Sequence, residues 1–358
     1  MDSCPSWDFS LSEKTFLAFF LLFLACVVFS VAANGFLFFL VARYRQLLWQ
    51  PQYILLKNIS ACGAGTGFTA ALALSVSVTQ RKTQSYGSWC VAQFCVLRCF
   101  FLTSQVTLAL MALERYVFIC HGIHYLRVIS GRNVHVCVGL AWLLSGAASV
   151  HGGLILSRAE GGSRRPTGGL LCDAVTVRQH LAFSVRDDVL VFGPPSVLTV
   201  LCILTICYCY ACMYHAALKV SMALKCSNHR ASRTVGLYIL MFLLQLAFNV
   251  FFVVLTLSEK RDAASCGVHR SLVTALLIAV PPGIFASFFA TRNPQINRLL
   301  RKLRGASAGG IRRIRQSSGS SAERTGKPTL HVEREGLNSS PPPLPGYIWT
   351  HSEDRQET

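Results

Sequence analysis

The segment LMALERYVFICHGIHYLRVIS, residues 110–130, holds the side chains of this sequence whose types and spacing most suggest chemistry. Glu114 and Arg115 are adjacent, which would suit an acid–base couple, an ion pair on a soluble helix, or the end of a membrane helix. His121 and His124 follow with an H-x-x-H spacing that two metal ligands could use. Two histidines without a nearby third ligand make a poor metal site. A solvated loop is the better interpretation, and we expect neither a metal nor a cofactor.

The composition indicates that lipid surrounds most of this chain. It has 358 residues, of which 52% are hydrophobic and only 14% are charged, whereas soluble domains carry about 25% charged residues. A helix needs about 20 apolar residues to cross a bilayer, and the runs here are continuous rather than alternating, which excludes a barrel. Windows of this kind cover residues 15–42, 52–78, 91–119, 134–157, 188–216, 233–257 and 270–291.

The charge distribution predicts how these spans are oriented. The net charge is +18, and the short connections RYRQLLWQPQ and HGIHYLRVISGRN are basic, as expected for cytoplasmic loops. We therefore predict an extracellular N-terminus at residues 1–14 and a membrane domain at residues 15–291. Attraction to anionic lipid of the inner leaflet explains the excess of Lys and Arg over Asp and Glu, so no nucleic-acid partner is expected.

Two further segments follow the last span. Residues 292–304 are predicted to form a short amphipathic helix on the membrane surface, because Leu299, Leu300 and Leu303 share one face and the other face is basic. Residues 305–358 are rich in Ser, Gly, Arg and Pro and predict a disordered cytoplasmic tail. Its SSPPPLPGY stretch favours a polyproline II conformation, which would serve as a spacer or dock a proline-recognition domain.

The Glu114–Arg115 pair then lies at the inner edge of the third window. Adjacent residues on a helix do not face each other, and a charge at the membrane edge is costly unless it has a partner or a function. Two interpretations stand. The pair is either a boundary marker, or a reversible clamp in which Glu114 holds Arg115 in one state and releases it to a partner protein in another.

The cysteines divide by their position. Most of the 15 cysteines lie in the windows or at their inner ends, where they act as small apolar residues. Four lie on the predicted outer side, where oxidation is allowed, and they permit three pairings. These are Cys4, Cys90, Cys172 and Cys266.

A cysteine at the outer start of the third span, with Glu114-Arg115-Tyr116 at its inner end, resembles rhodopsin-like (class A) G protein-coupled receptors. The resemblance covers residues 15–304 and implies an all-α bundle of seven membrane helices, a Cys90–Cys172 disulfide and a G-protein switch at Glu114, Arg115 and Tyr116. Supporting residues are Asn34-Gly35, Asn58, Ser60, Trp142, Pro194-Pro195 and Arg292-Asn293.

Three segments are similar to the sequences of odorant receptors, particularly those of fish. These segments are LMALERYVFIC, ASRTVGLYILMFLLQL and PPGIFASFFATRN. This implies a multi-pass plasma-membrane receptor, not an enzyme, that transduces binding of an extracellular small molecule, an odorant, to a heterotrimeric G protein. A non-olfactory orphan receptor and a receptor-like scaffold with little signalling are the alternatives. A retinal protein would need a lysine in the last window, and transporters need several intramembrane ionisable groups; neither is present.

The sequence also departs from the receptor pattern. Gly63 stands where these receptors usually carry an Asp in the second helix, which puts their internal sodium site in doubt. The sixth window contains no proline, so the usual kink and Trp switch do not carry over. Phe289 stands where an N-P-x-x-Y pattern would place its Tyr.

Arg98 is the strongest indication of a ligand. It lies about 12 Å along the helix from Cys90 at 1.5 Å per residue, and an intramembrane arginine needs a cavity or a partner. It would bind an anionic or carbonyl-bearing ligand, or else pair with Asp187 or Asp188 or snorkel toward the membrane surface. Gln245 and Asn249 lie one turn apart in the sixth window and would line this pocket or hydrogen-bond between helices. The predicted apolar walls are Leu97, Phe101 and Leu102.

Overall fold

The structure is a computed structural model of the full chain, and all statements below concern the residues whose placement it describes. These are residues 13–44, 50–80, 86–122, 125, 129–159, 171–180, 185–224, 240, 243–244, 246–248, 250–251, 268–292 and 296–301. The chain divides into one compact unit at Met1–Arg298 and a second at Leu299–Thr358.

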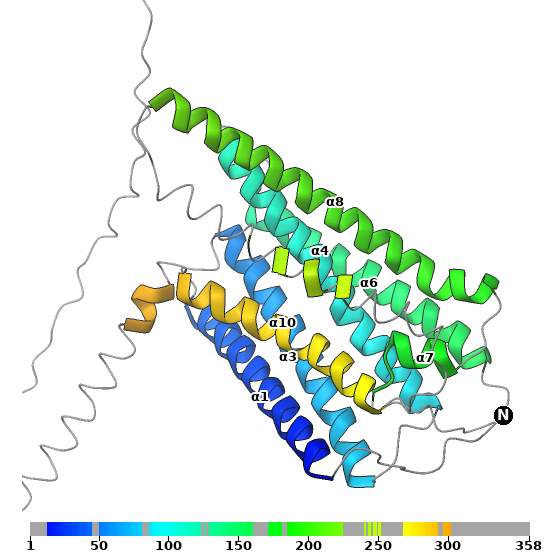
Figure 1. The fold of residues 1–358 in the computed structure, drawn as a ribbon. Coiled ribbons are helices and arrows are strands. Elements are labelled where there is room, and N and C mark those ends of the chain that lie inside the picture. The colour runs from blue at the N-terminus through cyan, green and yellow to red at the C-terminus, as the bar shows by residue number, and fades with distance from the viewer. Residues whose placement is uncertain are drawn as a thin grey trace, which may run out of the picture. The chain divides into compact units, whose positions relative to one another are not determined.

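Long helices account for the described part of the first unit (Figure 1). Five of them contain windows that are long and apolar enough to cross a membrane, and Val280–Thr291 forms a shorter apolar helical segment. The predicted window at 233–257 falls mostly outside the described residues, although those described within it are helical. The helices are α1 (Glu13–Arg43), α3 (Pro51–Gln80), α4 (Ser88–Cys120), α6 (Gly131–Ala159), α7 (Ala174–His180), α8 (Val185–Leu224) and α10 (Val268–Arg292).

Helix α4 holds the central place in this arrangement. It packs against α3, α6 and α8, while α1 packs against α3 and α10. Small residues allow these approaches, because a Cβ atom at Gly65 would lie 2.5 Å from the Phe100 ring. Large apolar side chains on the outer faces stay exposed, such as Phe39 at 64% and Leu143 at 67%. A lipid environment would cover them.

A polar tie joins three helices inside the bundle. Asn58 of α3 donates from Nδ2 to Oγ1 of Thr107 on α4 at 2.8 Å, and its Oδ1 accepts from Nε1 of Trp142 on α6 at 2.9 Å. Phe100 packs edge-on against the Trp142 ring, with centroids 5.8 Å apart. Asn58 therefore sets the register of α3, α4 and α6 with both ends of one amide.

Gly63 brings α3 close to α1. A Cβ atom at Gly63 would lie 2.7 Å from Oδ1 of Asn34, and the Asn34 amide donates to the Ser30 carbonyl at 2.8 Å. The amide of Asn34 thus occupies the space where a longer side chain at position 63 would extend. A side chain at position 63 would therefore require α1 and α3 to move apart or Asn34 to change its rotamer.

Of the predicted surface helix at 292–304, the described residues 296–301 are helical. Asn297 donates from Nδ2 to the Thr291 carbonyl at 2.5 Å. The predicted disordered tail at 305–358 lies outside the described residues. Its disorder, like the membrane contact of the surface helix, stays a prediction.

Candidate functional site

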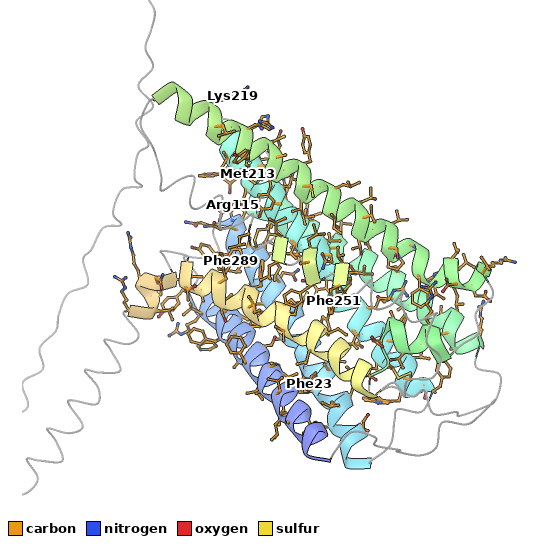
Figure 2. All side chains as sticks on the ribbon, viewed as in Figure 1. Phe23, Arg115, Met213, Lys219, Phe251 and Phe289 are labelled. Carbon is orange, nitrogen blue, oxygen red and sulfur yellow. A yellow bond between two sulfur atoms is a disulfide. The ribbon has the colours of Figure 1, made fainter. Side chains whose placement is uncertain are left out.

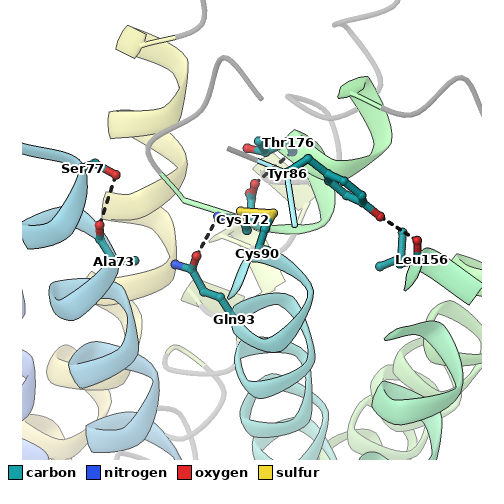
Figure 3. Close-up of a disulfide and its surroundings, with 9 residues drawn as sticks. Ala73, Ser77, Tyr86, Cys90, Gln93, Leu156, Cys172 and Thr176 are labelled. Carbon is teal, nitrogen blue, oxygen red and sulfur yellow. Dashed lines mark hydrogen bonds between the residues drawn. A yellow bond between two sulfur atoms is a disulfide. The ribbon is translucent and has the colours of Figure 1, made fainter. Parts of the chain in front are cut away.

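A disulfide joins the first turn of α4 to the segment that precedes α7 (Figure 3). Cys90 is bonded to Cys172, and the backbone N–H of Cys172 donates to Oε1 of Gln93 at 3.3 Å. The Thr176 N–H donates to Oδ1 of Asp173 at 3.0 Å, so Asp173 caps the start of α7. This confirms the predicted Cys90–Cys172 pairing, whereas Cys4 and Cys266 lie outside the described residues.

The four predicted ligand residues on α4 occupy one broad arc of the helix rather than a single wall. At about 100° per residue, Leu97 and Phe101 lie on one edge of this arc, Arg98 lies in the middle and Leu102 lies on the edge toward α6. Leu102 is 1% exposed, whereas Phe101 is 42% exposed. Phe101 therefore points away from the faces that pack against α3, α6 and α8. The other two predicted ligand residues, Gln245 and Asn249, lie outside the described residues.

Arg98 is held between three helices. Its Nη2 donates to the backbone carbonyl of Val191 on α8. Its guanidinium carbon lies 5.2 Å from the centre of the Phe94 ring, and Nη1 would lie 2.5 Å from a Cβ atom at Gly152 of α6. Asp188, one of the two acids predicted as a partner for Arg98, is instead paired with Arg178 of α7 at 2.5 Å.

Cations and aromatic rings connect α7 to Arg98. The Arg178 guanidinium lies 5.7 Å from the Phe192 ring centre, and Phe192 meets Phe94 edge-on at 6.4 Å. Phe94 in turn lies beneath Arg98. The two rings lie between the two cations, in the order Arg178, Phe192, Phe94, Arg98, and each cation lies near the ring next to it, so α7 is linked to Arg98 of α4.

A second polar cluster, called the inner cluster below, lies near the C-terminal end of α4. Glu114 is 3% exposed, and its Oε2 lies 3.4 Å from Nε of Arg115. Arg115 also donates from Nη2 to Oε1 of Gln52 on α3. The Tyr125 hydroxyl, in the following loop, donates to the other Glu114 oxygen at 2.8 Å. Burial, followed by the charge and hydrogen bond of Glu114, raises the pKa of Tyr125, so Tyr125 stays a hydrogen-bond donor at physiological pH.

Tyr116 follows Glu114 and Arg115 on α4, and its ring packs against other aromatic rings. Its ring meets His121 edge-on at 5.3 Å and lies 6.0 Å from Tyr208 of α8. It borders the apolar cluster that contains Met213, which lies at the same end of the bundle as Arg115 (Figure 2). His124 lies outside the described residues, and the part of the chain that is described contains no group of three metal-ligating side chains.

The sequence matches the family described as 7 transmembrane receptor (rhodopsin family) over residues 33–289. The chain belongs to this family. It is therefore a G protein-coupled receptor rather than an enzyme, and its partners are a ligand and a heterotrimeric G protein. The prediction of a seven-helix bundle, from apolar windows and from the resemblance, is confirmed. Family membership and the apolar helices make it a multi-pass protein of the plasma membrane.

Two olfactory receptors align along most of this chain, and a third aligns along about a third of it. Olfactory receptor 1G1 of Gorilla gorilla gorilla is 25% identical over 78% of this chain and 88% of its own length. Human olfactory receptor 1M1 is 25% identical over 81% of this chain and 90% of its own length. Human olfactory receptor 4K15 is 34% identical, but over 36% of this chain and 38% of its own length.

Several residues of this receptor were not predicted from the sequence. Gln52 and Tyr125 complete the inner cluster, yet a glutamine at a helix start and a loop tyrosine are ordinary residues without a motif. The role of the Val191 carbonyl as an acceptor could have been detected from one feature of the sequence. Pro195, four residues later, removes the amide that would normally donate to it.

Proposed function

We propose that this receptor detects an odorant, a small molecule that arrives from the extracellular side. The proposal rests on the similarity to named olfactory receptors, at 25% identity over 78% and 81% of the chain. The link from the disulfide-anchored α7 through Phe192 and Phe94 to Arg98 supports it, since it joins the outer loop to the predicted ligand residues.

In this proposal the ligand lies against the outer half of α4. Leu97 and Phe101 would supply the apolar contacts, and the partial exposure of Phe101 supports this because a packed core phenylalanine would be buried. Arg98 would attract a carbonyl or carboxylate group beside them. Leu102 would back this surface, and Gln245 and Asn249 would contribute from the sixth helix.

Ligand binding would shift the receptor toward a state whose inner end admits the G protein. Such a shift requires that the ligand bind this state more tightly than the resting state. Glu114 and Gln52 would restrain Arg115 at rest, and a released Arg115 would contact the G protein beside Tyr116. The two bonds of Arg115 support the reversible clamp over the boundary marker, because a marker needs no partner on α3.

The disulfide supports an extracellular N-terminus. Disulfides persist on the oxidising side of the membrane, and Cys90 lies at the start of α4. Since α1, α3 and α4 cross in succession, the start of α1 lies on the same side as the start of α4. The basic surface helix at 292–304 would then meet anionic inner-leaflet lipid, and the tail at 305–358 would offer its proline stretch to a proline-recognition domain.

The test is a screen of volatile compounds on cells that display the receptor, with cyclic AMP and calcium as readouts. A hit should lose potency about tenfold or more in Phe101→Ala, since a ligand that buries this exposed ring would gain about 1.5–3 kcal/mol from it. Leu143→Ala, at a side chain that is 67% exposed on α6, is the matched control.

Arg115→Ala should abolish the response at equal surface display. A receptor that responds equally with and without Arg115 would contradict the clamp, and no response to any volatile compound would favour the scaffold alternative.

A further inference from the structure

The backbone of α8 has a missing hydrogen bond in its outer half. In an α-helix the carbonyl of residue 191 accepts from the N–H of residue 195, but residue 195 is proline and has no N–H. A carbonyl left without a donor inside a membrane is costly, because no water is present to replace the bond. Val191 is itself fully buried.

Arg98 of α4 supplies a donor to this carbonyl. Its Nη2 bonds to the Val191 oxygen across the α4–α8 contact. We propose that Arg98 is a positioning residue that replaces the hydrogen bond removed by Pro195 and thereby fixes the outer half of α8 against α4.

Two neighbours of Arg98 suit a guanidinium, while its Nε and Nη1 have no hydrogen-bond partner among the described residues. Gly152 of α6 provides the space, since a Cβ atom there would lie 2.5 Å from Nη1 and 3.2 Å from the guanidinium carbon. Phe94 offers its ring face at 5.2 Å, which favours a cation that has been removed from water. The Arg98 side chain thus reaches α8, while Gly152 on α6 leaves room for it and the Phe94 ring on α4 lies near its charge.

This role goes beyond ligand contact and does not depend on it. A residue that only binds the ligand has no reason to bond to the carbonyl that a proline leaves open. By fixing α8, Arg98 would also hold the side of α4 that carries Leu97 and Phe101. The cation–ring link from Arg178 ends on the same side chain, so the outer loop would be held through it as well.

The two neighbouring prolines make a selective experiment possible. Arg98→Ala should lower the ratio of folded to unfolded receptor by about tenfold, as expected for a buried acceptor left without its donor. The double variant Arg98→Ala/Pro195→Ala restores the N–H that donates to Val191, so its surface display and thermal stability in detergent should recover most of this loss. Arg98→Ala/Pro194→Ala is the matched control, because the N–H at residue 194 would donate to Leu190 and should leave the deficit in place.

Three further variants serve as controls for this comparison. Pro195→Ala and Pro194→Ala alone measure any general gain from removing a proline, and the rescue must exceed that gain. Arg98→Lys keeps one cationic donor and should retain part of the stability. Equal deficits in Arg98→Ala and Arg98→Ala/Pro195→Ala, or equal rescue by the two prolines, would overturn the proposal. Ligand potency does not enter the readout, so the experiment stands apart from the test of odorant binding.

Discussion

Tyr125→Phe is the sharpest test of the inner cluster, because it removes one hydroxyl and leaves the ring in place. The lost bond is the 2.8 Å hydrogen bond from Tyr125 to Glu114. The ring contact between Tyr125 and Phe118, with centroids 5.2 Å apart, would remain. Glu114 would keep Arg115 as its remaining partner in the cluster. The variant therefore weakens the restraint without dismantling it.

The magnitude follows from the type of bond. A hydrogen bond to a charged group contributes about 1.5–3 kcal/mol, and the lower end applies because Tyr125 is only partly buried. If the bond exists only in the resting state, its loss changes the ratio of active to resting receptor by about tenfold. A receptor that is about 1% active without ligand would become about 10% active.

Basal cyclic AMP measured at equal surface display would report this change. Tyr214→Phe is the matched control, since Tyr214 is 50% exposed on α8. The Tyr214 ring lies next to the His215 ring, and Phe would keep that contact. Removal of the Tyr214 hydroxyl should therefore leave basal signalling unchanged. We expect basal signalling to rise severalfold in Tyr125→Phe and not in the control. Unchanged or reduced basal signalling in Tyr125→Phe would refute the view that this hydroxyl stabilises the resting state.

Two other changes test the packing of the bundle. Asn58→Leu removes both side-chain bonds that tie α3 to α4 and α6. The Trp142 N–H then loses its acceptor, whereas Thr107 keeps its bond to the Thr103 carbonyl. At about 0.6 kcal/mol for each bond within a membrane, with the cost of that N–H added, we expect a loss of about 2 kcal/mol and a lower melting temperature in detergent. Gly63→Asp restores the acid of other family members but places its Cβ 2.7 Å from Asn34 Oδ1, so surface display should fall, and Asn34→Ala in the same chain should recover part of it. A Gly63→Asp receptor with wild-type display would show that α1 and α3 can separate without cost.

The helices themselves could be predicted because lipid leaves the backbone few alternatives. A continuous apolar run must satisfy its own hydrogen bonds, so each long window becomes a helix. The window at 91–119 and the observed α4 at Ser88–Cys120 therefore agree closely. The Cys90–Cys172 disulfide could also be predicted, but through the resemblance, since the four outer cysteines alone allow three pairings.

Partners on other helices could not be predicted in the same way. The sequence suggested acids for Arg98, whereas the structure gives it the Val191 carbonyl and pairs Asp188 with Arg178. Rotation of α8 decides this, and an apolar run contains little information about rotation. Adjacency on a helix likewise argued against a Glu114–Arg115 pair, yet the flexible Arg115 side chain reaches back to 3.4 Å.

The two arginines of α4 share a property that bears on switching. Arg98 and Arg115 lie 17 residues apart, which corresponds to about 25 Å along a helix, and each donates to an uncharged oxygen on a neighbouring helix. Arg98 bonds to α8 through Val191, and Arg115 bonds to α3 through Gln52. A neutral acceptor holds a cation less tightly than a carboxylate does, so the bonds to Val191 and Gln52 would break at lower cost than the contact of Arg115 with Glu114. A movement of α4 relative to its neighbours would change both bonds, and the two ends of the bundle would then be coupled through α4.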